Sequence, residues 1–456
     1  MQVRVVLSVC LLGLVIAFGS LRVQHNRGSS QIMSGVMRPA LDYRALGNIH
    51  EQHFLCQSNA SSKKCYGVQQ IRNAYNITPL LNKGITGKGR SIVILDAYQA
   101  PHLHHDLALF DQYFNLPTFP LDIIAPDGSI AWNANSALQS SWSGEISLDV
   151  EWAHAIAPEA SIALVEAKTE DDANLISALN YAVDKNLGDI ISMSFGEGEN
   201  CVKPSLVAPW HAVFEAAVKK NITLLAASGD SGVAQQSCDS KTWDKDVSAP
   251  ASDSLVTGIG GTTLDADAET GQYNGEVGWN EPTRQAGSGG GFSQFMARPY
   301  YQVQVSTAAD KRGVPDVAYN ASTLHGVLSI WSDGPKGLDA VYSVGGTSAG
   351  APQWAAIVAL LDQYSQRRVG FINPAIYQIG KTPILYHSSF HDVVLGTNTI
   401  DLTTDAKVLN HYRGYKAQTN WDPVTGFGSP IVSKLIPLLA VLTIPSGEDL
   451  WGYKGK

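Results

Sequence analysis

Short apolar runs alternate with longer amphipathic segments in the chain after residue 90. The runs are apolar at nearly every position, which is typical of strands buried on both faces of a parallel sheet. The segments between them repeat apolar positions at helical spacing and have the length of ordinary helices. The pattern predicts an α/β fold in which a mostly parallel central sheet is flanked by helices. The expected strands are 91–97, 119–124, 161–166, 189–194 and 222–227, and the expected helices are 102–114, 142–156, 171–185 and 206–220.

The loops after the carboxyl ends of parallel strands meet at one edge of a sheet, where open α/β folds place their sites. Residues 265–345 are more irregular and rich in Gly, Trp and Tyr. Within them, the glycine-rich segment 287–293 is expected to form a loop or bulge whose backbone closely approaches another part of the molecule. The sequence has no internal repeat and no low-complexity linker after residue 65. We therefore expect one large domain over residues 66–443, followed by a tail over 444–456.

The first residues have the organisation of a targeting segment. Arg4 precedes an apolar run over 5–18, and small residues lie near its end. We predict a signal peptide over residues 1–19; an uncleaved signal anchor is the alternative, although the run is short for a membrane span. Residues 20–65 are polar and without periodicity, and are expected to form an N-terminal arm. We expect a secreted protein with no stable membrane association once the signal is cleaved.

Cysteine usage agrees with export. Cys10 lies within the predicted signal, which leaves Cys56, Cys65, Cys201 and Cys238. An even number of cysteines in an exported chain favours disulfides over free thiols or metal ligation. Four cysteines allow three pairings, and we prefer Cys56–Cys65 with Cys201–Cys238 because each of these closes a local loop.

The overall composition excludes some classes of partner. The formal net charge is −9 at pH 7, the sequence pI is about 5.7, and no cluster of Lys and Arg interrupts this balance. A nucleic-acid partner is therefore not expected. Hydrophobic residues make up 44% and charged residues 16% of the chain, which is typical of a globular protein with a sizeable core. We expect a monomer.

Ser348 is the first candidate catalytic residue. It lies in a run of glycines and small residues, and an apolar segment over 355–361 that follows it predicts a buried helix. Pro352 fits the first turn of such a helix, which needs no intrahelical N–H. A serine at this position has an accessible hydroxyl beside free N–H groups, which suits a nucleophile that develops negative charge. The alternative is that Thr347 or Ser348 only caps the helix.

Two acids provide the second candidate. Glu145 and Asp149 are four residues apart in an expected helix, so both carboxyl groups project from one face. Like charges in this arrangement repel unless they share a proton, and a shared proton makes one of them a general base. The alternative is a pair of solvated acids near a helix N-terminus. Glu151 lies off this face and is expected to be solvated, and His154 is expected to be a capping or surface histidine.

Two further interpretations remain open. The sequence Gly346-Thr-Ser348-Ala-Gly350 also fits the nucleophile elbow of α/β-hydrolases, and a histidine-dependent esterase could draw its other groups from the later part of the chain. The second interpretation is a non-catalytic secreted binding module on the same fold. An ordinary subtilisin could use Asp96 as its acid, but the expected histidine helix is absent from the sequence. The histidines and acids available to an esterase are His387, His391, His411, Asp392 and Asp401.

Several motifs together resemble the sedolisin family of serine-carboxyl peptidases. They are the acid pair on one helix, a Ser-Gly-Asp turn after a buried strand, and the serine motif with its proline. The resemblance extends from about residue 66 to about residue 442, with the motifs in the family's order. It implies a subtilisin-like three-layer fold. The matching segments are Glu145–Asp149, 228–230, 249–251, 260–262, 289–293, 298–299, 312–317, 346–352, 390–393 and 421–426.

The resemblance implies a role for each catalytic residue. Ser348 would be the nucleophile, Glu145 the general base and then acid, and Asp149 the group that orients Glu145. Asp230 would complete the oxyanion hole, which requires a protonated carboxyl because a carboxylate would repel the oxyanion. A glutamate in place of the usual histidine lowers the pKa of the base, so the enzyme is expected to act in acid. The implied activity is that of a serine-type endopeptidase on protein or peptide substrates.

The resemblance also implies two binding regions. Ser194, Phe195 and Gly196 match the strand that pairs with the substrate backbone. One structural calcium ion is implied near the C-terminus, where hard oxygen ligands suit calcium. The family commonly has glycines near two of the matching positions, Gln418 and Asn420. The complete implied ligand set is the carboxylates of Asp392 and Asp422 and the carbonyl groups of Val393, Gln418 and Asn420.

One feature departs from the family. Its members typically have a long N-terminal prodomain that folds ahead of the catalytic domain and inhibits it. The arm over residues 20–65 is far shorter than an independent domain. Three arrangements stay open: the arm inhibits the enzyme, a separate inhibitor or prodomain chain does so, or no inhibitor is needed.

Overall fold

The computed structural model describes residues 37–39, 41–51, 53–303, 305 and 310–443, all within a unit that covers Met33–Lys456. The predicted signal peptide, the beginning of the predicted arm and the predicted tail lie outside the described residues. No helix in these described ranges is long and apolar enough to cross a membrane.

A central sheet carries the fold, and all of its strand pairs are parallel except the one at the β14 edge. The strands run in the order β14-β13-β9-β7-β4-β6-β5, and β19 also pairs with β13. Every strand expected from an apolar run is present, with ends within two residues of the prediction. The strands are β4 (Ser91–Ala97), β5 (Leu121–Ile124), β6 (Ser161–Ala167), β7 (Ile190–Met193), β9 (Thr223–Ala227), β13 (Thr257–Ala266), β14 (Tyr273–Gly278) and β19 (Val317–Asn320).

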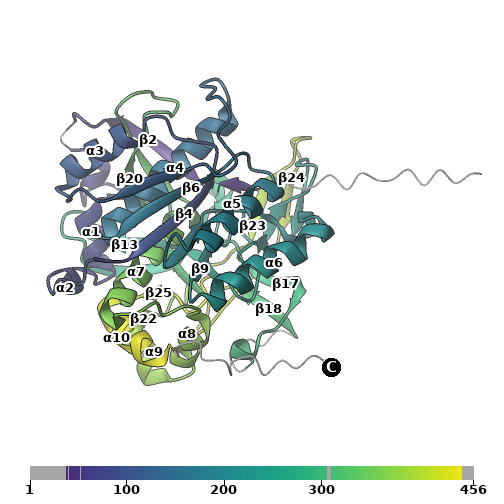
Figure 1. Ribbon diagram of the computed structural model, residues 1–456. Coiled ribbons are helices and arrows are strands. Elements are labelled where there is room, and N and C mark those ends of the chain that lie inside the picture. Colours follow the sequence, from purple (N-terminus) through teal and green to yellow (C-terminus); the bar gives the residue numbers. More distant parts are fainter. Residues whose placement is uncertain (1–36, 40, 52, 304, 306–309, 444–456) are drawn as a thin grey trace, which may run out of the picture. The chain divides into compact units, whose positions relative to one another are not determined.

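Helices cover both faces of this sheet (Figure 1). They are α1 (Val68–Ala74), α2 (Thr78–Leu81), α3 (Leu103–Phe114), α4 (Ala137–Ile156), α5 (Asp172–Lys185), α6 (Pro204–Lys219), α7 (Gly350–Ser365), α8 (Asn373–Gly380), α9 (Pro383–Ser389) and α10 (Val432–Leu442). Successive residues of β4 point to opposite faces, as in any strand. Ile92 and Ile94 belong to the apolar cluster that includes α4 and α7, whereas Val93 and Leu95 belong to the cluster with α5 and α6. The three-layer α/β architecture is confirmed.

A second sheet connects the N-terminal segment to the candidate nucleophile. Its strands are β2 (Asp42–Asn48), β3 (Cys65–Tyr66), β20 (Gly326–Ile330) and β21 (Ala340–Gly345), in the order β2-β21-β20-β3. β2 runs antiparallel to β21, the strand that leads directly to Ser348. The described part of residues 20–65 is therefore packed into the fold, whereas the sequence suggested an extended arm.

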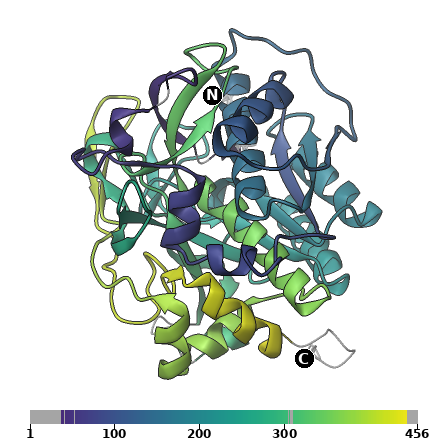
Figure 2. The same ribbon diagram turned by 90° about the vertical axis from the view of Figure 1, so that its left-hand side faces the viewer.

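Short strand pairs make up most of the irregular region and the C-terminal part. A third small sheet has the order β1-β8-β12. In Figure 2, the yellow-green helices α8, α9 and α10 near the end of the chain lie together, and α9 also packs beside β22. The remaining strands are β1 (Arg38–Pro39), β8 (Phe195–Gly198), β10 (Ala234–Gln236), β11 (Trp243–Lys245), β12 (Ser248–Ala249), β15 (Asn280–Glu281), β16 (Ala286–Gly287), β17 (Gly291–Ala297), β18 (Lys311–Val314), β22 (Phe390–His391), β23 (Ile400–Thr403), β24 (Leu409–Tyr412) and β25 (Ser429–Pro430).

Both preferred disulfides are confirmed. Cys56–Cys65 and Cys201–Cys238 each join Cα atoms 5.1 Å apart. The first pins the described end of the N-terminal segment beside β3. The second connects the segment after β8 to the loop that follows β10, on the border of the candidate substrate strand.

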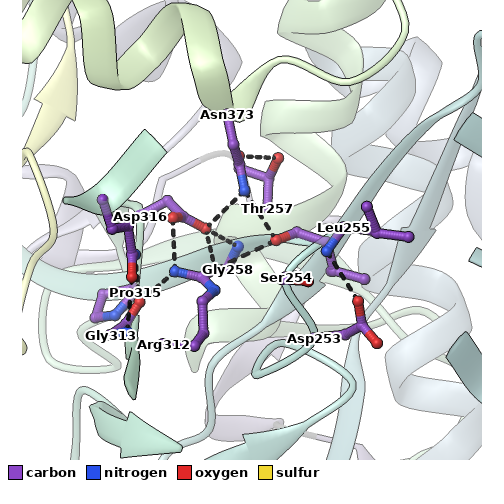
Figure 3. Close-up of polar contacts among 12 residues, drawn as sticks. Asp253, Ser254, Leu255, Thr257, Gly258, Arg312, Gly313, Pro315, Asp316 and Asn373 are labelled. Atoms are coloured by element: carbon purple, nitrogen blue, oxygen red, sulfur yellow. Dashed lines mark hydrogen bonds and ion pairs between the residues drawn. The ribbon is translucent and has the colours of Figure 1, made fainter. Parts of the chain in front are cut away.

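A buried ion pair connects several strands to one another (Figure 3). Arg312 and Asp316 are both fully buried, and their closest nitrogen and oxygen atoms are 2.6 Å apart. Asp316 also accepts hydrogen bonds from the Gly258 N–H and the Tyr377 hydroxyl, each at 2.8 Å. Both oxygens of this carboxylate therefore have partners, and the pair ties β18 and β19 to β13 and α8.

Candidate active site

Ser348 lies in a short 3₁₀ turn, Thr347–Ala349, between β21 and α7. The turn begins at Gly346, whose φ of 94° is a left-handed conformation that favours glycine. Helix α7 starts immediately afterwards with Pro352 in its first turn, as predicted. The side chain of Ser348 is fully buried, and its hydroxyl donates a hydrogen bond to the carbonyl oxygen of Ser194 at 3.0 Å. The serine is thus held at the carboxyl edge of the sheet, beside the end of β7.

Glu145 and Asp149 lie on α4 and are both fully buried. The alternative of two solvated surface acids is therefore wrong. Burial raises the pKa of Glu145 well above its usual value, the charges of Asp149 and Asp96 raise it further, and Ser348 counteracts part of the rise. Burial likewise raises the pKa of Asp149, against the effect of hydrogen bonding from Ser194 and Glu145. Neither oxygen of either carboxyl group has a well-formed hydrogen bond among the described residues.

Asp96 is a third buried acid at this place. It lies near the end of β4, and burial together with the charges of Asp149 and Glu166 raises its pKa well above the usual value. The sequence suggested Asp96 only as the acid of an ordinary subtilisin. The structure instead adds it to the Glu145 and Asp149 cluster. The sequence feature that could have identified Asp96 as part of this cluster is its position as an acid near the carboxyl end of a buried strand.

Asp230 lies in the turn after β9 and is partly exposed to a cavity. Its Oδ1 accepts hydrogen bonds from the N–H and the hydroxyl of Thr347, both at 2.8 Å, whereas Oδ2 has no partner among the described residues. Burial raises the pKa of Asp230 to about 7, although the two bonds from Thr347 lower it. Thr347 therefore fixes the carboxyl group directly next to Ser348. This role of Thr347 was not predicted from the sequence.

The glycine-rich segment fits tightly against the Asp230 turn, as expected. The Gly289 N–H donates to the carbonyl oxygen of Gly229 at 2.7 Å. A Cβ atom on Gly289 would lie only 2.1 Å from the carbonyl oxygen of Ser228. The close backbone approach is what keeps Asp230 at a fixed distance from the serine turn.

The three residues expected to pair with a substrate lie between β7 and β8 and at the beginning of β8: Ser194 follows β7, Phe195 is buried and Gly196 is partly exposed. One edge of β8 pairs with β12, and the other pairs with β1 of the N-terminal segment. A cavity of about 230 Å³ lies beside this strand and is lined by residues that include Gly196, Asp230, Gln235 and Trp243.

Hydrogen bonds join four of the five implied calcium ligands in two pairs. The N–H of Asn420 donates to Asp392 at 3.1 Å, and the N–H of Gln418 donates to Asp422 at 3.0 Å. In the part of the chain that the structure describes, no donor is bonded to the carbonyl oxygens of Val393, Gln418 or Asn420. Asn420 has a φ of 64°, which explains why a glycine suits this position. Two carboxylates and three free carbonyl groups fit a hard cation.

Side chains alone would not form that site. No three His, Cys, Asp or Glu side chains among the described residues are placed to hold a metal ion. The backbone carbonyl groups are therefore needed. Burial raises the pKa of Asp422 to about 6, although hydrogen bonds from three backbone N–H groups and from Thr425 lower it.

Two expectations about α4 are wrong. Glu151 is fully buried, not solvated, and accepts hydrogen bonds from the Ser329 hydroxyl at 2.6 Å and the Ile330 N–H at 3.2 Å. His154 is also fully buried: its ring stacks on Phe119, with centroids 4.0 Å apart, and it lies 3.1 Å from Asp111. The physical reason is that β20 covers α4 at Glu151, whereas Asp111 of α3 and Phe119 cover His154.

The histidines required by an esterase lie elsewhere. His391 stacks on Tyr273, with ring centroids 3.8 Å apart, and burial lowers its pKa to about 4. His411 bonds to Asp401 at 2.7 Å on the exposed hairpin of β23 and β24. The groups around Ser348 are carboxyl groups.

Comparison with known proteins agrees with this geometry. Residues 128–376, more than half of the chain, match the subtilase family. Kumamolisin of Bacillus sp. (strain MN-32) is 32% identical over 399 residues, which cover 85% of this chain and 66% of kumamolisin. Sedolisin of Pseudomonas sp. (strain 101) is 31% identical over 283 residues, which cover 60% of this chain and 44% of sedolisin.

A solved structure is also similar. It is Pseudomonas sedolisin, a serine-carboxyl proteinase complexed with two molecules of pseudo-iodotyrostatin. The similarity has a TM-score of 0.70 and 25% identity, and it covers 84% of this chain and all of that one. The chain spans 66% or less of the length of the curated relatives named above. These matches, together with the acid pair on α4, show that the chain belongs to the subtilase family and, within it, to the sedolisins, the serine-carboxyl peptidases.

Proposed function

We propose that this protein is a secreted serine-type endopeptidase that acts in acid and cleaves peptide bonds through an acyl-enzyme. The observation that carries the proposal is the cluster of buried carboxyl groups around Ser348, in which Asp230 keeps one oxygen free beside the cavity. A buried carboxyl group without a cation is unfavourable when charged, so protons are retained here. Retained protons are what general acid catalysis and oxyanion stabilisation require.

In the proposed first step, the Ser348 Oγ attacks the carbonyl carbon of the substrate. Glu145 accepts the hydroxyl proton, and Asp149 orients Glu145 because the two acids are neighbours on one face of α4. The carbonyl oxygen becomes an oxyanion that accepts hydrogen bonds from the protonated Asp230 and from the Ser348 N–H. Glu145 then gives its proton to the leaving nitrogen, and the carbon–nitrogen bond breaks. Water hydrolyses the ester by the reverse sequence of proton transfers.

The pH dependence follows from Asp230. Its pKa is raised to about 7 by burial, so the neutral donor form dominates below that pH. Above it the carboxylate would repel the oxyanion, and activity should fall. At very low pH, the Glu145–Asp149 pair loses its remaining negative charge and no base is left. Plotted against pH, activity should therefore pass through a maximum below neutral pH.

Calcium is proposed as a structural ion. Asp392, Asp422 and the carbonyl groups of Val393, Gln418 and Asn420 would hold it. Bound calcium would fix the loop before Trp421 against β22, away from the reacting atoms. The proposed partners are protein or peptide substrates, and the protein is proposed to act as a monomer. Secretion is supported by the two disulfides, which persist in oxidising compartments.

The test is digestion of an unfolded protein from strongly acidic to mildly alkaline pH. Ser348→Ala and Glu145→Gln should abolish activity at every pH. Glu151→Gln is the matched control, because Glu151 is an equally buried acid on the same helix that bonds only to β20. The control should keep the activity of the unmodified chain. Activity that peaks above neutral pH, or that survives Glu145→Gln, would contradict the proposal.

A further inference from the structure

The small sheet β1-β8-β12 separates two cavities. Successive side chains of a strand point to opposite faces of its sheet. In β12, Ser248 lines the cavity of about 230 Å³ that borders Asp230, whereas the next residue, Ala249, lines a second cavity. The second cavity is therefore on the opposite face of the sheet, where α6 and β17 form its other walls.

The second cavity is lined mainly by apolar side chains, and we call it the apolar pocket. Trp210 and Phe214 of α6 are two of its walls, and Phe295 and Met296 of β17 are two others. Trp210 and Phe214 are buried and stack on each other, with ring centroids 5.6 Å apart. Phe295 is 57% exposed and lies at the open side of the pocket.

Two acids in the wall of the apolar pocket have partners of their own. Asp253 bonds to His211 Nδ1 at 2.7 Å and accepts a hydrogen bond from the Leu255 N–H at 2.8 Å. Glu199 accepts a hydrogen bond from the Gln294 N–H. Neither acid needs a partner from a ligand. The pocket therefore suits an apolar side chain rather than a cation.

The register of β8 relates these cavities to the scissile bond. The Ser348 hydroxyl bonds to the carbonyl oxygen of Ser194, so the peptide residue beside Ser194 is the one whose carbonyl group the serine attacks. Antiparallel pairing advances one residue on each strand at a time. The peptide residue opposite Gly196 is therefore the third on the amino side of the scissile bond. Arg38 has this position in the structure, and Met37 has the fourth.

The side chains at these two positions point into different cavities. Arg38 is exposed, and it reaches the wall of the larger cavity, where it donates to the Ser240 hydroxyl at 2.6 Å. Met37 is only 1% exposed and lies in the apolar pocket. About 40 Å³ stays open beside Met37, more than one water molecule requires. The pocket therefore has room for a side chain larger than methionine.

We propose that the apolar pocket selects the fourth residue on the amino side of the scissile bond, and that it takes a large apolar side chain there. The inference rests on the proposed function and specifies its substrates. They are extended segments with at least four residues before the bond, so the enzyme cuts within chains and does not remove tripeptides from their ends. A substrate that begins at the third residue leaves the pocket empty and loses the burial of this side chain.

The experiment compares peptides that differ only at the fourth position. They are copied from a site that the enzyme cuts in an unfolded protein, with Leu, Ala or Asp at that position. The full chain carries Met37→Gly, because Met37 would otherwise compete for the pocket. The Leu peptide should have a kcat/KM roughly 10-fold or more above that of the Ala peptide, and the Asp peptide should be cut more slowly still. Equal rates for the Leu and Ala peptides would overturn the proposal.

A shortened peptide tests whether the enzyme needs the fourth residue. It has the same sequence but begins with a free amino group at the third residue. Its kcat/KM should not exceed that of the Ala peptide, since both leave the pocket without a large side chain. Faster cleavage of the shortened peptide than of the Leu peptide would show that the enzyme removes tripeptides, and the proposal would be wrong.

A substitution in the wall tests the pocket itself. Phe295→Ala removes a half-exposed ring on which little of the core depends. It should reduce the ratio of the Leu rate to the Ala rate by roughly twofold or more, the lower end of coupling between groups in contact, and leave the rate for the Ala peptide unchanged. Ile384→Ala is the matched control, because Ile384 is 84% exposed on α9 and lines neither cavity. An unchanged ratio in Phe295→Ala would overturn the assignment.

The same measurements separate this proposal from the proposed function. If the Leu and Ala peptides are cut equally fast, the apolar pocket is not a specificity site and the proposed function stands. If a folded chain, checked by its cooperative unfolding in denaturant, cuts no peptide at any pH, both proposals fail.

Discussion

The raised pKa of Asp230 makes a prediction about stability that needs no measurement of activity. In Asp230→Asn, the amide oxygen can still accept both hydrogen bonds from Thr347, while the ionisable group is lost. The usual pKa is 3.8, and burial raises it to about 7 in the folded chain. A raised carboxyl pKa contributes stability that is present below pH 3.8 and is lost as the pH rises through about 7. The unmodified chain should therefore be destabilised by this group at pH 8, and the variant should not.

The magnitude follows from the size of the shift. Each pKa unit corresponds to about 1.4 kcal/mol, so a shift of about three units amounts to roughly 4 kcal/mol. Asp230 borders a cavity, and screening by water reduces this value, so we expect about 2–4 kcal/mol. The free energy of unfolding of Asp230→Asn relative to its parent should increase by that amount between pH 4 and pH 8.

Denaturant unfolding at the two pH values measures this difference, with Ser348→Ala as the parent so that no proteolysis interferes. Asp239→Asn provides a control of opposite sign, because hydrogen bonds lower the pKa of that exposed acid. If the difference in the free energy of unfolding between Asp230→Asn and its parent is the same at pH 4 and pH 8, the conclusion that Asp230 is protonated is refuted.

Three other predictions concern the scaffold and the metal. Arg312→Ala should lower the free energy of unfolding by about 3–5 kcal/mol, because it leaves a fully buried carboxylate unpaired, and a loss below 1 kcal/mol in chemical denaturation would contradict this. Excess EDTA should lower the melting temperature by linkage to calcium at Asp392 and Asp422, and an unchanged temperature would remove the metal assignment. Gly289→Ala should reduce kcat, because its Cβ would displace the carbonyl oxygen of Ser228 and the adjacent Asp230 turn; unchanged kinetics would show that the turn tolerates this shift.

The sequence predicted the central sheet well because β4, β6, β7 and β9 are buried on both faces and therefore apolar at most positions. It also brought Glu145 and Asp149 together, since their spacing is a property of one helix. Ser348 and Asp230 could be identified because each lies in a turn after a buried strand. These are all local signals.

The errors concern contacts between segments that are distant in the chain. Glu151 and His154 were assigned to solvent because α4 was treated as a helix with one buried face. β20, from far along the chain, covers Glu151, and Asp111 and Phe119 cover His154. The anchoring of Asp230 by Thr347 also joins two distant turns. β1 was not predicted because a two-residue strand has no periodicity to detect.

Gly144 has a consequence for how α4 holds its first acid in place. Glycine in the interior of a helix is about 1 kcal/mol less favourable than alanine, yet here a Cβ would stand 2.9 Å from Leu41 and 3.0 Å from the Trp331 ring. Because Gly144 has no side chain, Leu41 and Trp331 pack directly against the backbone of α4, one residue before Glu145. The helix is therefore intrinsically weaker at this turn, and tertiary packing keeps the backbone of Glu145 in position.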